Sequence, residues 1–213
     1  MSRINYFHSL IFFNICIILS AFDFLRNNNF LIISLFLILS LGISHGALDH
    51  LKGIKLLKIL KYDTIYMFYF FYILLALIVI FAWIIFPKFL LLLFLIVASY
   101  HFGKEDSEFI KLNSKIDIIY FFKGSLVITA PLLFHKTETL KIFMDLNFNV
   151  YESLFVSNEF IYFLISLSFI SNIIISLNKD INIKALLLMD FISVLLINFF
   201  LQPILAFTIY FCF

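Results

Sequence analysis

Long apolar runs alternate with short polar segments along the whole chain. Each run approaches the length of a helix that crosses a bilayer, which needs roughly 20 apolar residues at about 1.5 Å per residue. Every backbone polar group in lipid must be bonded internally, so runs of this kind predict helices. We therefore predict an all-α, polytopic transmembrane bundle of about seven to eight helices, the last one incomplete. The predicted spans are 7–22, 30–50, 64–86, 88–103, 116–134, 159–177 and 184–201, and an eighth begins near Pro203.

The composition indicates that lipid is the solvent of this chain. Of its 213 residues, 64% are hydrophobic and 13% are charged, and the mean hydropathy is +1.11. A soluble fold of this size could not bury so much apolar surface. The first run, 7–22, has no small-residue cleavage motif after it and is predicted to be a retained span. No polar stretch is long enough for a second domain, so we expect a single integral-membrane domain over 1–213.

The distribution of basic residues predicts an orientation. Cytoplasmic loops of membrane proteins carry an excess of Lys and Arg. With the N-terminus inside, ten basic residues fall on the cytoplasmic side: Arg3, Lys52, Lys55, Lys58, Lys61, Lys104, Lys111, Lys115, Lys179 and Lys184. Only four fall outside: Arg26, Lys88, Lys136 and Lys141. We expect a multi-pass protein of the cell (inner) membrane with a cytoplasmic N-terminus. The net charge of +2 is too small to imply a nucleic-acid partner.

Two histidine motifs interrupt the apolar pattern at the ends of the second and fourth spans. They are GISHGALDH, which contains His45, and SYHFGKED, which contains His101. In the predicted topology both histidines lie at matching depths near the cytoplasmic face. In a continuous helix His45 and Asp49 share a face, because residues four apart lie one turn apart. Asp49 could then fix the tautomer of His45 for metal binding. His50 could be a third ligand or a polar residue at the headgroup boundary.

Neutral imidazoles suit iron, copper, zinc and nickel, so the two motifs indicate a possible metal site. A site of histidines, with or without a carboxylate, and with an open position would favour oxygen chemistry on iron. The alternative is that these histidines are polar residues tolerated near the membrane interface. His8 and His135 have no second polar motif beside them, and we interpret them in that way. Spacing alone does not identify the chemistry.

Two charged residues lie inside predicted spans. Lys123 has a long stem that could snorkel to the interface, or it could orient a loop or a headgroup. Asp190 lies deeper in its span. It could pair with a neighbouring helix or support a ligand histidine, because an isolated charge in lipid is costly.

The sequence also carries a family resemblance. The segments GISHGALDH, SYHFGKED, KGSLVITAPLLFH and PILAFTIYFCF resemble, in this order and at similar separations, the Brp/Blh family of membrane beta-carotene dioxygenases. The resemblance covers nearly the whole chain, and the first two motifs are its specific part. It implies cleavage of the central 15,15′ double bond of beta-carotene by O2, giving two retinal molecules, at a non-haem Fe(2+). It implies His45 and His101 as iron ligands.

The resemblance also implies partners and a way of holding the substrate. The partners would be beta-carotene, O2, the lipid bilayer and a retinal-binding rhodopsin that accepts the product. Beta-carotene is a long apolar rod that partitions into bilayers, so an aromatic-lined tunnel open to lipid is expected. Ordinary lipid-facing or core packing is the alternative for the aromatic residues concerned. They are Tyr66, Tyr69, Tyr72, Phe94 and Tyr100.

The end of the sequence departs from the family pattern. The family's other two ligands come from an HSxRH-like motif directly after the YF run of the last span, whereas this sequence ends with IYFCF. The run from Pro203 to Phe213 is also about half the length that a bilayer span needs. We therefore expect the gene to continue with a histidine-containing segment, and we expect this 213-residue form to bind iron poorly.

Two other functions fit part of the pattern. A di-iron membrane desaturase or hydroxylase is possible because HGALDH has an H-x4-H spacing, but such enzymes use many more histidines than the five present here. A small transporter or structural membrane protein with incidental histidines is the non-enzymatic alternative. Many transporters have pairs of Gly- or Pro-broken spans in symmetric halves, and this sequence has no such pair.

Overall fold

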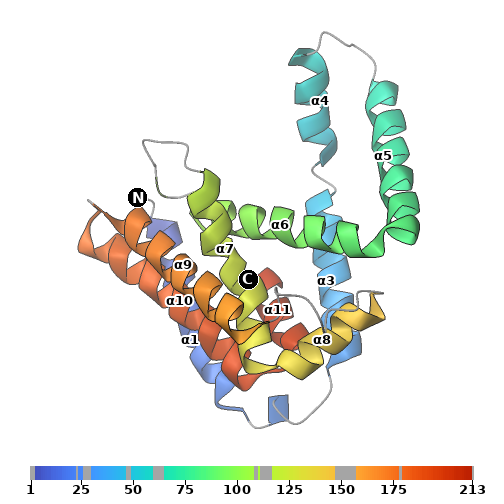
Figure 1. Ribbon diagram of the computed structural model, residues 1–213. Coiled ribbons are helices and arrows are strands. Elements are labelled where there is room, and N and C mark those ends of the chain that lie inside the picture. Colours follow the sequence, from blue (N-terminus) through green and yellow to red (C-terminus); the bar gives the residue numbers. More distant parts are fainter. Residues whose placement is uncertain are drawn as a thin grey trace.

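The computed structural model describes residues 3–22, 24–25, 30–46, 49–59, 65–107, 110, 117–146, 157–177 and 179–212. Only the backbone is described at 3–6, 42–46, 49–52 and 65. This part of the chain contains ten labelled helices and no strand, which confirms the all-α prediction. They are α1 (Arg3–Ser20), α3 (Leu31–Gly46), α4 (Asp49–Ile59), α5 (Ile65–Ile85), α6 (Pro87–Glu105), α7 (Asp117–Phe134), α8 (Lys136–Asp145), α9 (Asn158–Ser176), α10 (Ile181–Phe200) and α11 (Pro203–Cys212) (Figure 1).

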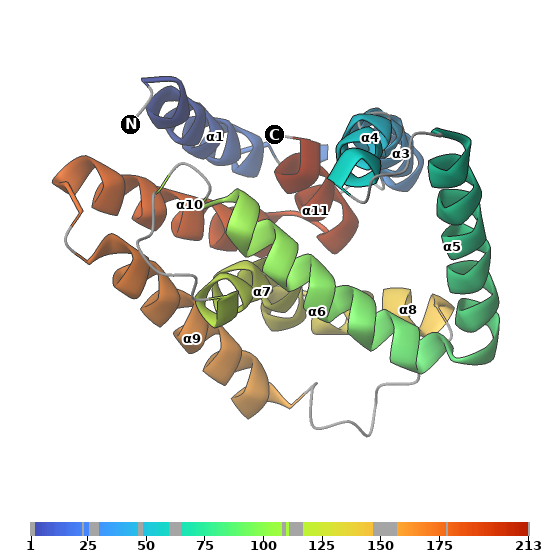
Figure 2. The same cartoon turned by 90° about the horizontal axis from the view of Figure 1, so that it is seen from above.

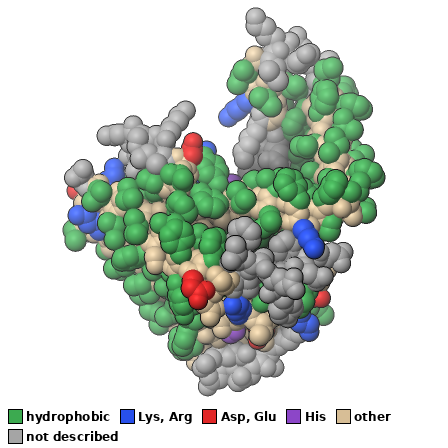
Figure 3. Space-filling model, viewed as in Figure 1, with side chains coloured by type: hydrophobic (Ala, Val, Ile, Leu, Met, Phe, Trp, Pro, Cys, Tyr) green, Lys and Arg blue, Asp and Glu red, His purple; other side chains and the backbone are tan. Residues whose placement is uncertain are grey.

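Five helices in the described ranges are long and apolar enough to cross a membrane: α5, α6, α7, α9 and α10. Their bounds lie within about three residues of the predicted spans. The first, second and last predicted spans are shorter apolar helices in this structure, Phe7–Ser20, Leu31–Leu41 and Pro203–Cys212. Hydrophobic side chains cover most of the face seen in Figure 3, and charged side chains form small groups on it. The chain is therefore a membrane-type helix bundle.

Two helices, α4 and α8, were not predicted. Within the predicted span 30–50 the structure describes α3 up to Gly46 and α4 from Asp49. Residues 47 and 48 lie outside the described residues, so a single helix over 30–50 stays a prediction. α4 and α8 are only partly apolar, so the apolar pattern of the sequence predicted loops at these positions.

The core of the bundle is built around α7, which packs against α6, α9 and α10, while α1 lies against α10 and α11 lies against α3. Figures 1 and 2 both place α7 between α6 and α9, and α5 at the edge of the molecule. The contact between α6 and α7 is close because two glycines meet there. A Cβ on Gly103 would collide with the backbone of Tyr120 and Gly124, and a Cβ on Gly124 would collide with the backbone of Ser99 and Gly103. This crossing holds the end of α6, which carries His101, against the core.

Candidate metal centre

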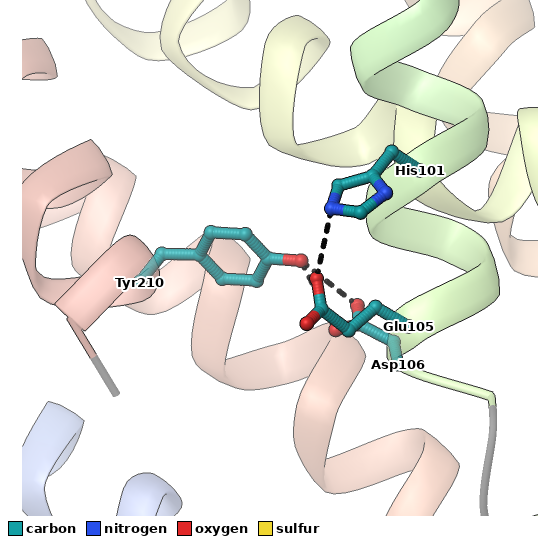
Figure 4. Close-up of polar contacts among 4 residues, drawn as sticks. All are labelled: His101, Glu105, Asp106 and Tyr210. Carbon is teal, nitrogen blue, oxygen red and sulfur yellow. Dashed lines mark hydrogen bonds and ion pairs between the residues drawn. The ribbon is translucent and has the colours of Figure 1, made fainter. Parts of the chain in front are cut away.

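His101 and Glu105 form a pair on the last turns of α6. They are four residues apart, so both side chains project from the same face of the helix. The Nε2 atom of His101 lies 3.2 Å from the Oε2 atom of Glu105, and the two side chains are 68% and 57% exposed. Figure 4 shows the imidazole directed at the carboxylate. The pair offers an accessible nitrogen and an accessible carboxylate, both of which are ligand types that iron accepts.

Asp106, which follows α6 directly, connects this end of the helix to α11. The hydroxyl group of Tyr210 donates to Oδ2 of Asp106 at 3.0 Å and lies 3.1 Å from Oδ1 (Figure 4). Burial raises the pKa of the Asp106 carboxyl, while the Lys123 ammonium and the Tyr210 hydroxyl act in the opposite direction. Through its hydrogen bond with Tyr210, Asp106 joins the end of α6 to α11, although the two helices are far apart in the sequence.

Lys123 reaches the same turn from α7. Its side chain is buried, with 5% exposed, and its Nζ atom donates to the backbone oxygen of Asp106 at 2.9 Å and to the hydroxyl of Ser107 at 3.1 Å. The hydroxyl of Ser168 on α9 donates to the backbone oxygen of Lys123 at 3.1 Å. Of the two roles expected for Lys123, the structure therefore shows the contact to a loop and not a snorkelling side chain.

Asp190 on α10 belongs to the same polar region. It accepts a hydrogen bond from the side chain of Ser9 on α1 and interacts electrostatically with Lys123 and Asp106. These interactions fit the first role expected for Asp190, pairing with a neighbouring helix, while support of a ligand histidine stays a prediction.

An aromatic cluster lies beside His101 at the contact of α6 with α11. The ring of Phe102 lies edge-on to Phe207 and Tyr210, with centroids 6.1 Å and 5.4 Å apart. Phe207 stacks on Phe211 at 5.8 Å. All four rings are half-buried. They form an apolar surface next to the His101 side chain, whose ring lies 6.2 Å from that of Phe102.

The aromatic residues expected to line a tunnel lie elsewhere. Four of them are exposed on α5 and α6: Tyr66, Tyr69, Tyr72 and Phe94. Their positions correct the tunnel expectation and fit the lipid-facing alternative, because α5 buries none of its described residues. Only Tyr100 is close to the site, since it precedes His101 and its hydroxyl donates to Oδ1 of Asp117 at 3.0 Å.

The other predicted site residues lie outside the described side chains. His45 belongs to the last turn of α3, and Asp49 and His50 are the first two residues of α4; only their backbones are described. The shared face expected for His45 and Asp49 depends on residues 47 and 48, which lie outside the described residues, and it stays a prediction. α11 packs against α3 and also contacts Phe102 of α6, so it connects the helices that carry His45 and His101.

The described residues supply fewer donors than a metal ion needs. Among the described residues no group of three or more His, Cys, Asp or Glu side chains could hold a metal ion. His101 and Glu105 supply two donors of suitable chemistry in an accessible position. His135 lies at the opposite end of α7, where its Nδ1 atom is 3.8 Å from Glu138. Sequence reasoning did not assign roles to Glu105, Asp106 or Tyr210; the KED cluster was a signal for the first two, but Tyr210 is 104 residues away from its partner.

Comparison with known proteins identifies the family. No curated protein and no solved structure matches this chain. The family model described as beta-carotene 15,15′-dioxygenase matches residues 36–213, a region that includes both histidine motifs, the α6–α7 crossing and α11. This match covers most of the chain and agrees with the helical membrane fold, and the protein therefore belongs to the beta-carotene 15,15′-dioxygenase family.

Proposed function

We propose that this protein is a non-haem iron dioxygenase that cleaves beta-carotene at its central 15,15′ double bond. The two oxygen atoms of O2 become the aldehyde oxygens of two retinal molecules, so no external reductant is required. The observation that carries the proposal is the accessible His101–Glu105 pair beside an apolar aromatic cluster, in a chain that belongs to this family. Family membership favours this function over the desaturase and transporter alternatives.

His45 and His101 are the iron ligands in this proposal, with Asp49 and His50 as supporting or additional ligands. Fe(2+) bound there would activate O2 next to the double bond. The Nε2 atom of His101 lies 3.2 Å from Glu105, so a proton on Nε2 would be held by the carboxylate and Nδ1 would be left as the ligand atom. The carboxylate would thus fix the tautomer and the orientation of the imidazole.

The aromatic cluster serves the substrate. Phe102, Phe207 and Phe211 offer flat apolar rings beside His101, and a polyene can pack against such rings without any polar partner. The bilayer supplies beta-carotene directly, so the substrate does not pass through water. A retinal-binding rhodopsin in the same inner membrane would accept the product, and the positive-inside pattern supports a cytoplasmic N-terminus.

The proposal is tested in beta-carotene-producing cells. We expect cells that express the full-length protein to contain retinal, measured by chromatography of the extract, and to lose colour. His45→Ala and His101→Ala should produce none at equal expression, because each removes a ligand. His135→Ala, at the far end of α7, is the matched control and should retain the activity. Retinal production at the original rate by both ligand variants would show that the ligand assignment is wrong.

A further inference from the structure

The turn that follows α6 is held by side chains from two other helices. Lys123 of α7 donates to the Asp106 backbone oxygen and to Ser107, and Tyr210 of α11 donates to the Asp106 carboxylate. Glu105, the partner of His101, immediately precedes this turn. α6 ends at Glu105, so no further helical turn supports the segment that follows. The bonds from Lys123 and Tyr210 hold this segment in place instead.

Lys123 carries a buried charge, so its ammonium group can lie only where suitable partners surround it. A buried ammonium group needs opposite charges and hydrogen-bond acceptors, because desolvation costs several kcal/mol. Lys123 is attracted electrostatically to Asp106 and to Asp190. Asp190 in turn interacts with Ser9 and His8. The cation of α7 therefore bonds to the end of α6 and is attracted to a carboxylate on α10.

The glycine crossing leaves little freedom for this contact. Gly124 follows Lys123 directly, and Gly103 is two residues after His101. The close approach of α6 and α7 at these glycines fixes the position of Lys123 relative to α6, and therefore which polar groups its Nζ atom can reach. The nearest polar groups at that place belong to the Asp106–Ser107 turn.

We propose that Lys123 and Tyr210 are positioning residues that hold the turn after α6, so that the His101–Glu105 pair faces the aromatic cluster of α11. Neither residue contacts the reacting atoms; both act through the Glu105–Ser107 segment. The inference rests on the proposed function for the role of His101, but the holding of the turn is measurable without any reaction.

The test is hydrogen–deuterium exchange on the protein in lipid nanodiscs, with retinal production and Fe(2+) binding measured on the same samples. Tyr210→Phe removes only the hydroxyl group. Lys123→Met combined with Asp190→Asn removes the cation together with one of its counter-charges, so that no carboxylate is stranded beside α10. The matched controls are Tyr162→Phe, an exposed tyrosine on α9, and Lys136→Met, which removes an exposed lysine bonded to Asn158 at 2.7 Å.

We expect local loosening in the two test variants. The Asp106 and Ser107 amides, which bond to Phe102 and Lys104 at 2.9 Å and 3.1 Å, should exchange about tenfold faster, as expected for loss of one hydrogen bond to a charged group. The amides of α9 and α10 should keep their rates. Retinal production per folded protein should fall by at least about fivefold, and half-saturation with Fe(2+) should need about fivefold more metal. Both controls should resemble the wild type.

Unchanged exchange at Asp106 and Ser107 in both test variants would overturn the inference. An equal rise of the exchange rate in all helices would also overturn the inference, because it would show a general loss of stability. Loosening of the turn with wild-type iron binding and retinal production would also overturn it, while leaving the proposed function intact. If the wild type binds iron but makes no retinal, and the variants show the loosened turn and weaker iron binding, the proposed reaction fails and the positioning role stands.

Discussion

The close crossing of α6 and α7 predicts a large effect from the smallest possible substitution, Gly103→Ala. A Cβ at this position would lie 2.7 Å from the backbone nitrogen of Gly124 and 2.8 Å from the carbonyl carbon of Tyr120, and closer still to the oxygen of that carbonyl. An ordinary contact begins at 3.4 Å, so the two backbones must separate by about 0.7 Å or more. Backbone atoms cannot rotate away, and the whole crossing must therefore open.

The magnitude follows from two opposing terms. Overpacking of a close contact costs about 1–3 kcal/mol, and a clash with a carbonyl group belongs at the upper end. Alanine is favoured over glycine within a helix by about 1 kcal/mol, which offsets part of this cost. We expect a net destabilisation of about 2 kcal/mol, which lowers the folded to unfolded ratio by roughly 30-fold.

The assay is reversible unfolding in mixed micelles, followed by circular dichroism as the mole fraction of denaturing detergent rises. Gly53→Ala is the matched control, because the three atoms nearest to its new Cβ all belong to the ring of Phe68, a side chain that can turn aside. The control should change stability by less than about 1 kcal/mol. A Gly103→Ala protein as stable as the wild type would refute the close crossing.

Four further outcomes are expected. Ser157→Ala should destabilise the protein by about 1 kcal/mol in the same unfolding assay, because its hydroxyl caps α9 by accepting from the Phe160 backbone N–H at 3.2 Å. Glu105→Gln should weaken Fe(2+) binding about tenfold without a comparable loss of stability, as titration and unfolding would show, because a supporting carboxylate is lost. Lys58→Cys should resist labelling from outside intact cells, because the positive-inside pattern predicts a cytoplasmic segment there. Removal of iron by a chelator should stop retinal production, and added Fe(2+) should restore it.

The long spans could be predicted from the sequence because lipid imposes a length. A helix such as α5 or α9 needs about 20 apolar residues whatever it packs against, so its existence follows from local composition. The shorter helices depend on other contacts. α8 begins directly after α7 and carries polar residues in its first turn, and its place is fixed by packing of Leu140 against Leu132, which local composition does not reveal.

The candidate site was only partly predictable, because its supporting contacts are long-range. His101 stands out in the sequence, and Glu105 follows at helical spacing. Tyr210 looks like any aromatic residue of an apolar span, and only the folded chain brings its hydroxyl to Asp106. Spacing finds partners within one helix, whereas partners on other helices require the packing itself.

α7 shows which sequence feature marks the centre of such a bundle. Polar groups inside a span are costly when they face lipid and favourable when they face other helices, so a span rich in them belongs in the interior. The buried residues of α7 include Lys123, Gly124, Ser125 and Thr129, and half of its most apolar stretch is buried, whereas none of α5 is. Small residues let α6 approach, and the approach lets Lys123 reach the turn beside the proposed metal ligand. The same polar residues that weaken α7 as a membrane span therefore make it the helix on which the site is built.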